Sequence, residues 1–368
     1  MLATPGPGQT VIPSAYTSLN PSEPAAQIGG PVTGTEGAGR IGVMFQCATP
    51  PEELPEFARR AEATGFDELW VVEDCFFNGG VSAAAAALAA TTRIGVGLGI
   101  LPAGVRNPAF TAMEFATLAR IYPGRFTGGL GHGMPAWMAQ VGAAAASPLT
   151  LLEERLTVLR SLLRGETVTK AGRYTNLGEV TLAAPPATVP PVYAGVRGPR
   201  SLELAGRAAD GTILAEPVTA EYLQAARRHI ANGAAQAGRA GHHPVVAYSV
   251  FAAATDPAEA RAAAAAALSR AFVPGTGTHL TGLDFAAELT ARLRWAAETG
   301  GAAQLDEDWV DRLTVSGTPE KCAARIGELH AAGADSVCLI PASSGGRLFT
   351  QSADVLAAVR TNARDAGS

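Results

Sequence analysis

One histidine stands where its side chain could take part in chemistry. His132 lies between Gly131 and Gly133, in a loop that leaves a predicted strand. Flanking glycines let a ligand approach the backbone closely, and an imidazole that titrates near neutrality suits proton transfer. The alternative is a surface or hydrogen-bonding histidine without a catalytic role.

Two adjacent acids, Glu73 and Asp74, follow another predicted strand. Side chains of neighbouring residues on an extended segment point to opposite sides, so only one of them faces a site at the strand end. That acid could donate a proton or hold a ligand. The other is expected to be a solvated charge or a helix cap.

A third candidate is the segment Val196-Arg197-Gly198, which precedes a predicted helix beginning near Ser201. Backbone N–H groups at a helix start, together with an arginine, bind anions such as a phosphate. The alternative is a strand-to-helix turn that needs glycine for its backbone angles. Barrels also often bind phosphate after their seventh and eighth strands.

Eight short apolar runs alternate with helical patterns and could position these residues. The predicted strands are residues 41–46, 69–72, 94–101, 125–130, 191–195, 212–215, 245–252 and 336–340. Strands that are apolar throughout and alternate with helices indicate parallel βαβ units. Their number and the chain length favour an α/β fold, a (β/α)8 TIM barrel with insertions, over a doubly wound open sheet.

Active sites of such barrels lie at the carboxyl ends of the strands. This rule selects the following residues: Gln46, Glu73, Asp74, Gly99, Ile100, His132, Arg197, Glu216 and Pro341.

Composition narrows the class of protein. The 368 residues are 47% hydrophobic and carry a net charge of −5, which argues against nucleic acid or an anionic membrane as partner. No apolar run is long enough to span a bilayer, and the start does not read as a signal peptide. The four scattered cysteines lack metal-ligand spacing, so we expect no metal and reduced thiols in a cytoplasmic protein.

The domain organisation is predicted to be simple. Residues 1–39 are rich in Pro, Gly, Ser and Thr and are expected to be a flexible extension. Residues 40–368 are expected to form the barrel domain, with insertions at about 165–190, expected to be a hairpin, and at 274–317. Apolar residues of the second insertion could line a substrate space or simply pack on the barrel.

Five segments in order resemble the bacterial-luciferase-like oxidoreductases. They are residues 65–74 (GFDELWVVED), 92–100 with Arg106-Asn107-Pro108, 124–133 (GRFTGGLGHG), 191–211, and 317–335. The resemblance implies a luciferase-like TIM barrel, a homodimer, and binding of either FMN or the deazaflavin coenzyme F420. The loop at Val196-Arg197 looks more like that of the F420-dependent members than that of the FMN-dependent ones. The chain also has only two lysines, a bias that suits a GC-rich genome such as that of an actinobacterium, and actinobacteria commonly make F420.

The resemblance also implies roles for individual residues. The expected catalytic residues are His132 and Glu73. At the place of Gly99-Ile100 the family carries a bulge with a non-proline cis peptide; the alternative is that Gly99 is merely a tight strand end. The expected cofactor-binding residues are Gln46, Asp74, Gly99, Ile100, Gly131, Gly195, Val196, Arg197 and Gly198.

Three departures qualify the resemblance. Relatives usually carry Asp-His where this chain has Glu73-Asp74. In the F420-dependent glucose-6-phosphate dehydrogenases a lysine follows the sixth strand, where Glu216 stands here, and a glutamate occupies the position of His132. Oxidation of a sugar phosphate is therefore not expected.

The function expected from these residues is hydride transfer between F420 and a small organic substrate, such as reduction of an activated C=C, C=N or C=O. His132, or else Glu73, would supply the proton. The alternatives are an FMN-dependent two-component monooxygenase and a barrel without cofactor that serves as a binding or structural subunit.

Overall fold

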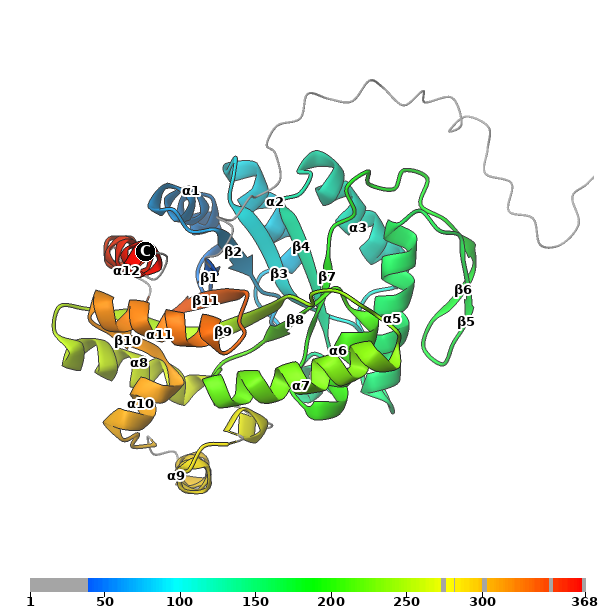
Figure 1. Cartoon of the computed structure of the whole chain (residues 1–368). Coiled ribbons are helices and arrows are strands. Elements are labelled where there is room, and N and C mark those ends of the chain that lie inside the picture. Colours follow the sequence, from blue (N-terminus) through cyan, green and yellow to red (C-terminus); the bar gives the residue numbers. More distant parts are fainter. Residues whose placement is uncertain (1–38, 273–275, 281, 300–302, 344–346, 366–368) are drawn as a thin grey trace, which may run out of the picture.

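The computed structural model describes residues 39–272, 276–280, 282–299, 303–343 and 347–365. Eight parallel strands form a closed barrel surrounded by helices (Figure 1). The predicted extension, residues 1–39, lies outside the described residues except for Gly39. Within the described part, no helix is long and apolar enough to cross a membrane.

The strand order confirms the predicted barrel. The eight strands, in order around it, are β1 (Arg40–Phe45), β2 (Glu68–Val71), β3 (Gly95–Pro102), β4 (Phe126–Gly131), β7 (Val192–Gly195), β8 (Gly211–Leu214), β9 (Val245–Ala253) and β11 (Ser336–Pro341). Because β8 pairs with β9 and β11 pairs with β1, these eight strands close into a barrel. Each predicted strand agrees with the observed one to within a residue at either end.

Helices cover the outside of the barrel (Figure 1). They are η2 (Pro51–Glu53), α1 (Leu54–Thr64), α2 (Gly80–Ala90), α3 (Pro108–Ile121), α4 (Pro135–Gln140), α5 (Pro148–Leu163), α6 (Pro199–Ala208), α7 (Ala220–Gln236), α8 (Pro257–Ala271), α11 (Pro319–Ala331) and α12 (Leu348–Asp365). Several helices begin with a capping side chain followed by proline: Asn107 caps α3, Asp256 caps α8 and Thr318 caps α11.

A layer of large side chains fills the middle of the barrel. Trp70 is almost fully buried and meets Tyr248 edge to face, with ring centroids 5.8 Å apart. Gly97 faces the indole, and a Cβ there would lie 2.3 Å from a ring carbon of Trp70. A glycine on β3 is therefore what makes room for the tryptophan of β2.

At the end of the barrel where the strands begin, Glu68 is the centre of a buried polar network. Its carboxylate lies 2.6 Å from the Arg40 guanidinium and accepts hydrogen bonds from Trp70 Nε1 at 2.9 Å and Ser336 Oγ at 2.7 Å. These contacts join β1, β2 and β11. The network ties neighbouring strands together and gives this buried acid its partners.

The first insertion contains a hairpin, as predicted. Strands β5 (Val168–Ala171) and β6 (Asn176–Val180) pair antiparallel outside the barrel.

The second insertion holds η3 (Thr276–Leu280), α9 (Ala286–Thr299), α10 (Glu307–Leu313) and the short strand β10 (Val315–Gly317). The sequence did not predict β10. It pairs with the last three residues of β9, on the side opposite β11. Apolar side chains of the insertion pack together: Leu280, Leu283, Phe285, Leu289 and Trp309 are buried in a cluster separate from the main core, whereas Trp295 is 56% exposed.

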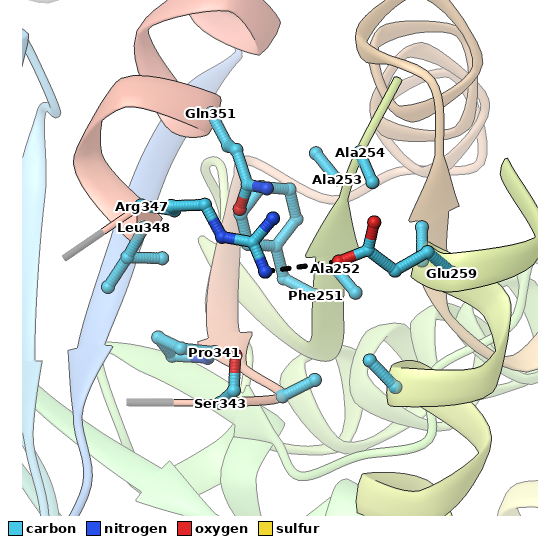
Figure 2. Close-up of a pocket in the computed structure, with 13 residues that line it drawn as sticks. Phe251, Ala252, Ala253, Ala254, Glu259, Pro341, Ser343, Arg347, Leu348 and Gln351 are labelled. Atoms are coloured by element: carbon cyan, nitrogen blue, oxygen red, sulfur yellow. Dashed lines mark hydrogen bonds and ion pairs between the residues drawn. The ribbon is translucent and has the colours of Figure 1, made fainter. Parts of the chain in front are cut away.

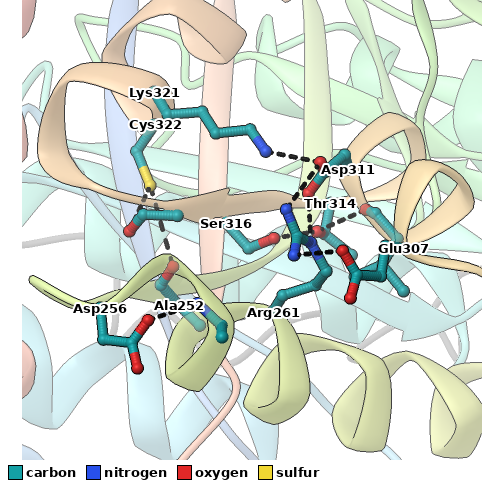
Figure 3. A network of polar contacts seen from close by, with 12 residues as sticks. Ala252, Asp256, Arg261, Glu307, Asp311, Thr314, Ser316, Lys321 and Cys322 are labelled. Atoms are coloured by element: carbon teal, nitrogen blue, oxygen red, sulfur yellow. Dashed lines mark hydrogen bonds and ion pairs between the residues drawn. The ribbon is translucent and has the colours of Figure 1, made fainter.

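Ion pairs attach this insertion to the barrel (Figure 3). Asp311 of α10 accepts hydrogen bonds from Arg261 of α8 and lies 2.5 Å from Lys321 Nζ of α11. Arg261 also reaches Glu307 at 2.7 Å. One acid thus joins two barrel helices to the insertion.

Candidate active site

The predicted bulge at the end of β3 is present. The pairing of β3 with β4 changes register between Leu98 and Leu101, and the peptide bond between Gly99 and Ile100 is cis, as expected.

Glycines surround the Ile100 side chain at this bulge. A Cβ on Gly195 would lie 2.3 Å from an Ile100 methyl, and one on Gly131 would lie 2.7 Å from the Gly195 carbonyl. The ends of β3, β4 and β7 therefore approach each other closely, with bare backbone around one apolar side chain. Such a surface suits the edge or face of a flat ring.

Tyr248 contributes an unpaired hydroxyl beside the bulge. The residue is 3% exposed, and its hydroxyl has no hydrogen-bond partner among the described residues. A Cβ on Gly99 would lie 2.3 Å from that oxygen. Burial raises the pKa of Tyr248 well above its usual value, and the charges of Cys338, Glu216 and Asp74 act in the same direction. The phenol is therefore neutral.

Asp74 faces the barrel mouth. Its carboxylate accepts a hydrogen bond from the Cys47 thiol, with Sγ 3.5 Å from Oδ2. Burial raises the pKa of Asp74, while the thiol and the charge of Arg197 work against that rise. Burial likewise raises the pKa of Cys47, to about 12, so the thiol keeps its proton.

Glu73 has a different environment from its neighbour. It forms a two-pronged ion pair with the Arg106 guanidinium and accepts a hydrogen bond of 2.8 Å from the Gly80 N–H at the start of α2. The expectation that one of the two adjacent acids caps a helix is confirmed. Because its two oxygens already have partners, Glu73 has little capacity left for a substrate.

Glu216 follows β8 and precedes Pro217 through a cis peptide bond. Burial raises its pKa; the charge of Arg197 opposes the rise and that of Asp74 adds to it. Asp74, Arg197 and Glu216 follow β2, β7 and β8, so all three lie at the carboxyl end of the barrel. Among the described residues, none of the three forms an ion pair within 4 Å.

Arg197 is held by its backbone. Its carbonyl accepts a hydrogen bond of 2.8 Å from the Tyr222 hydroxyl, and the Tyr222 ring stacks on His279 at 4.7 Å. His279 in turn lies 3.0 Å, through Nδ1, from the Pro217 carbonyl. Burial first, and then the charge of Arg197, lower the pKa of His279 to about 4. His279, from the second insertion, thus contacts the loop of Arg197 through Tyr222 and the loop of Glu216 through Pro217.

The start of α6 lies next to Arg197. Gly198 is the N-cap residue, and no side chain caps the helix. Val196 is buried, and its N–H donates to the Ile213 carbonyl. The backbone of the helix start and the Arg197 guanidinium are therefore the groups that this segment offers to an anion.

His132 lies beside the same helix. Its Nε2 is 3.0 Å from the Ser201 hydroxyl in the first turn of α6. Burial lowers the pKa of His132, and the backbone of Pro148 opposes that effect. The imidazole is therefore neutral at neutral pH. Gln46, also at the mouth, donates from Nε2 to the Pro341 carbonyl at 2.8 Å.

A second pocket lies at the ends of the seventh and eighth barrel strands, β9 and β11 (Figure 2). Its one arginine, Arg347, reaches across to Glu259 at 3.1 Å. This guanidinium already has a carboxylate partner, which Arg197 lacks among the described residues. No group of three metal-ligating side chains occurs in the part of the chain that the structure describes.

The strand-end rule placed Glu216 at the barrel mouth, but the sequence did not indicate its role. The signal was an acid directly before a proline at a strand end. Tyr248 was missed because a tyrosine in the middle of an apolar strand is usually part of the core.

Three comparisons with known proteins bear on this site. Residues 28–336 match the family described as luciferase-like monooxygenase. Over 298 residues the chain is 33% identical to 5,10-methylenetetrahydromethanopterin reductase of Methanolobus tindarius, covering 78% of this chain and 90% of the relative. Over 175 residues it is 34% identical to an F420-dependent glucose-6-phosphate dehydrogenase of Nakamurella multipartita, covering 44% and 52%.

A solved structure has the same fold. The F420-dependent tetrahydromethanopterin reductase of Methanopyrus kandleri superposes with a TM-score of 0.72 at 23% identity, covering 87% of this chain and 97% of that one.

Proposed function

The chain belongs to the luciferase-like monooxygenase family, and on that premise we propose that it is an F420-dependent oxidoreductase. It transfers a hydride between the deazaflavin and a small organic substrate, in the direction of reducing an activated C=C, C=N or C=O. The observation that carries this proposal is the 33% identity to a reductase over nine-tenths of that relative's length.

The residues at the mouth fit such a coenzyme. The Gly99–Ile100 bulge with Gly131 and Gly195 presents the bare backbone that a flat ring needs. The uncapped start of α6 at Gly198, with the Arg197 guanidinium, offers donors for the coenzyme's phosphate. Gln46, Asp74 and the backbone of Val196 complete the predicted binding set. When bound in its reduced form, the coenzyme supplies a hydride.

The protein's own groups then orient the substrate and handle the proton. His132 is our candidate for proton transfer, because it directly follows β4 and its neutral imidazole can donate an N–H. Glu73, the other candidate from the sequence, is already held by Arg106 and the start of α2. We assign Glu73 the role of fixing the loop that carries Asp74.

The test is a binding titration of the purified protein with F420 and, separately, with FMN, followed by fluorescence. We expect saturable F420 binding that weakens about tenfold or more in Arg197→Ala, the range for loss of a charge-assisted hydrogen bond. Arg200→Ala is the matched control, because Arg200 is an exposed arginine at the start of α6, three residues after Arg197. Binding of F420 should be unchanged in that variant.

Two other outcomes would redirect the assignment. Saturable binding of FMN without F420 would point to an oxygen-dependent monooxygenase. Binding of neither would contradict the proposal and favour a barrel that works as a binding or structural subunit.

We also propose that the protein is a cytoplasmic homodimer. Helix α3 exposes Phe110, Met113 and Ile121, which are 65%, 55% and 58% exposed and lie near one face of the helix. Side chains of this size are rarely left in water as a group, and a second copy would cover them. Light scattering should show a dimer that Met113→Glu converts to monomer; a wild-type monomer would refute this part.

A further inference from the structure

A cavity of about 700 Å³ lies at the carboxyl end of the barrel, between the loops that follow β2, β3 and β4. Its volume is typical of sites for small molecules, which span about 300–1,000 Å³. Residues 73–79, 104–106 and 141–143 line it. Because Asp74 is among them, the cavity adjoins the predicted coenzyme-binding set.

The walls of this cavity are apolar and open to water. Phe76 and Phe77 are 66% and 57% exposed, and Val105 and Val141 are exposed too. The remaining wall has little side-chain volume and consists of Gly79, Gly104, Gly142 and Ala143. Large apolar side chains that are gathered around a hollow, rather than scattered singly over a surface, mark a binding site.

The loop that carries the two phenylalanines is held in place. The Phe77 N–H donates a hydrogen bond of 2.8 Å to the Asp74 carbonyl, which closes a turn. Asn78 donates from Nδ2 to the carbonyls of Cys47 and Thr49, each at 3.2 Å, and so ties the loop to the segment after β1. The rings are therefore positioned before a ligand arrives, which lowers the entropy that binding has to remove.

The charges at the cavity favour a neutral ligand over an anion. Glu73 and Arg106 form an ion pair with each other, and Glu73 also accepts the Gly80 N–H. Asp74, which accepts a hydrogen bond from the Cys47 thiol, would repel an anion. An anion would thus give up its hydration and gain no free cation in return.

We propose that this cavity binds a neutral aromatic group of the substrate, a part that the reaction leaves unchanged. The inference rests on the proposed function, which makes the bound molecule a substrate. Phenyl rings attract another flat ring beyond the effect of buried area, and the glycine and alanine wall leaves room for it. Binding energy from such a remote group can orient the part of the substrate that is reduced.

The other conceivable occupant is a second copy of the chain. The side chains that we assign to the dimer face, Phe110, Met113 and Ile121 of α3, do not line the cavity. They lie on a helix that covers the outside of the barrel, whereas the cavity lies at the strand ends, where barrels bind their substrates. The two surfaces can therefore be tested separately.

The test uses two fluorescent probes with the same rings. N-phenyl-1-naphthylamine is neutral, and 8-anilinonaphthalene-1-sulfonate adds one negative charge. Each is titrated into the protein, with and without bound F420. We expect the neutral probe to bind at least about tenfold more tightly, and the double variant Phe76→Ser/Phe77→Ser to lose about tenfold or more of that affinity.

The matched control is Phe110→Ser, because Phe110 is 65% exposed but lies outside the cavity. This variant should bind the neutral probe like the wild type. Thermal unfolding checks that each variant is folded. Phe77→Leu, which keeps an apolar side chain but removes a ring, provides a second measurement and should lose less affinity than the double variant.

Three results would overturn one of the two proposals. Probe binding that is indifferent to Phe76 and Phe77, or equally weakened by Phe110→Ser, would overturn the inference, and F420 binding would leave the proposed function standing. A double variant that turns monomeric with unchanged probe binding would assign the phenylalanines to a contact between copies. Failure of F420 to bind, with probe binding still dependent on the phenylalanines, would instead overturn the proposed function.

Discussion

Where the barrel strands begin, Glu68 shares its carboxylate among Arg40, Trp70 and Ser336. Where the strands end, Asp74 has one long hydrogen bond to a thiol, and Glu216 has no ion-pair partner among the described residues. Both ends of the barrel therefore hold acids, a buried one where the strands begin and half-buried ones where they end, but only the first end gives its acid a full set of partners.

This difference indicates that the first end stabilises the fold and that the second end is available to a ligand. A satisfied buried network holds strands together, whereas an unsatisfied one destabilises the fold and leaves its hydrogen-bonding capacity to a ligand. If this is correct, neutralising an acid should lower stability where the strands begin and raise it where they end.

The largest effect is expected from Glu68→Ala. It leaves Arg40 without its carboxylate and deprives Trp70 Nε1 and Ser336 Oγ of their acceptor, so the free energy of unfolding should fall by about 3 kcal/mol. Denaturant unfolding measures it. Glu68→Gln keeps an acceptor and should lose clearly less. Equal losses in the two variants would mean that the side-chain volume, rather than the network, matters.

A medium effect is expected at the floor of the mouth. Gly99→Ala places a Cβ 2.3 Å from the Tyr248 hydroxyl, and such overpacking costs about 1–3 kcal/mol. Tyr248→Phe removes that oxygen and an unsatisfied buried group, so the double variant should recover most of the loss. A double variant as unstable as Gly99→Ala alone would show that the clash lies elsewhere.

The smallest effect is expected from Glu216→Gln, and it is a gain rather than a loss of stability. Burial raises the pKa of Glu216 in the folded protein, so the folded state holds the proton more tightly than the unfolded chain. The stability of the wild type should therefore fall as the pH rises through the folded pKa, and the glutamine variant should escape that fall.

Thermal unfolding of the cofactor-free protein across pH tests this sign. The variant should melt above the wild type at neutral pH, and the gap should close in acid. A variant that melts below the wild type at neutral pH would show that Glu216 has a structural partner after all.

The barrel could be predicted from the sequence because each strand is a short apolar run with a helix after it. The run at residues 94–101 agrees with β3, Gly95–Pro102, including the glycine that accommodates Trp70. The strand β10 escaped prediction because three residues, Val315–Gly317, show no periodicity, and their pairing depends on where β9 happens to end.

The site could be predicted only in part. The strand-end rule brought Asp74, Arg197 and Glu216 to one mouth, but it says nothing about which charges are paired. That Glu73 is matched by Arg106 depends on a contact across 33 residues of chain. Pairing of this kind is a property of the folded barrel and cannot be read from spacing.

The apolar cluster of the second insertion is separate from the main core, yet it includes Val250 of β9 and Ala264 and Leu268 of α8. Evolution can therefore vary the outer residues of the insertion without repacking the other barrel strands, whereas its inner residues must continue to fit one strand and one helix of the barrel. His279 adds a further constraint, because its imidazole contacts the Pro217 carbonyl after β8.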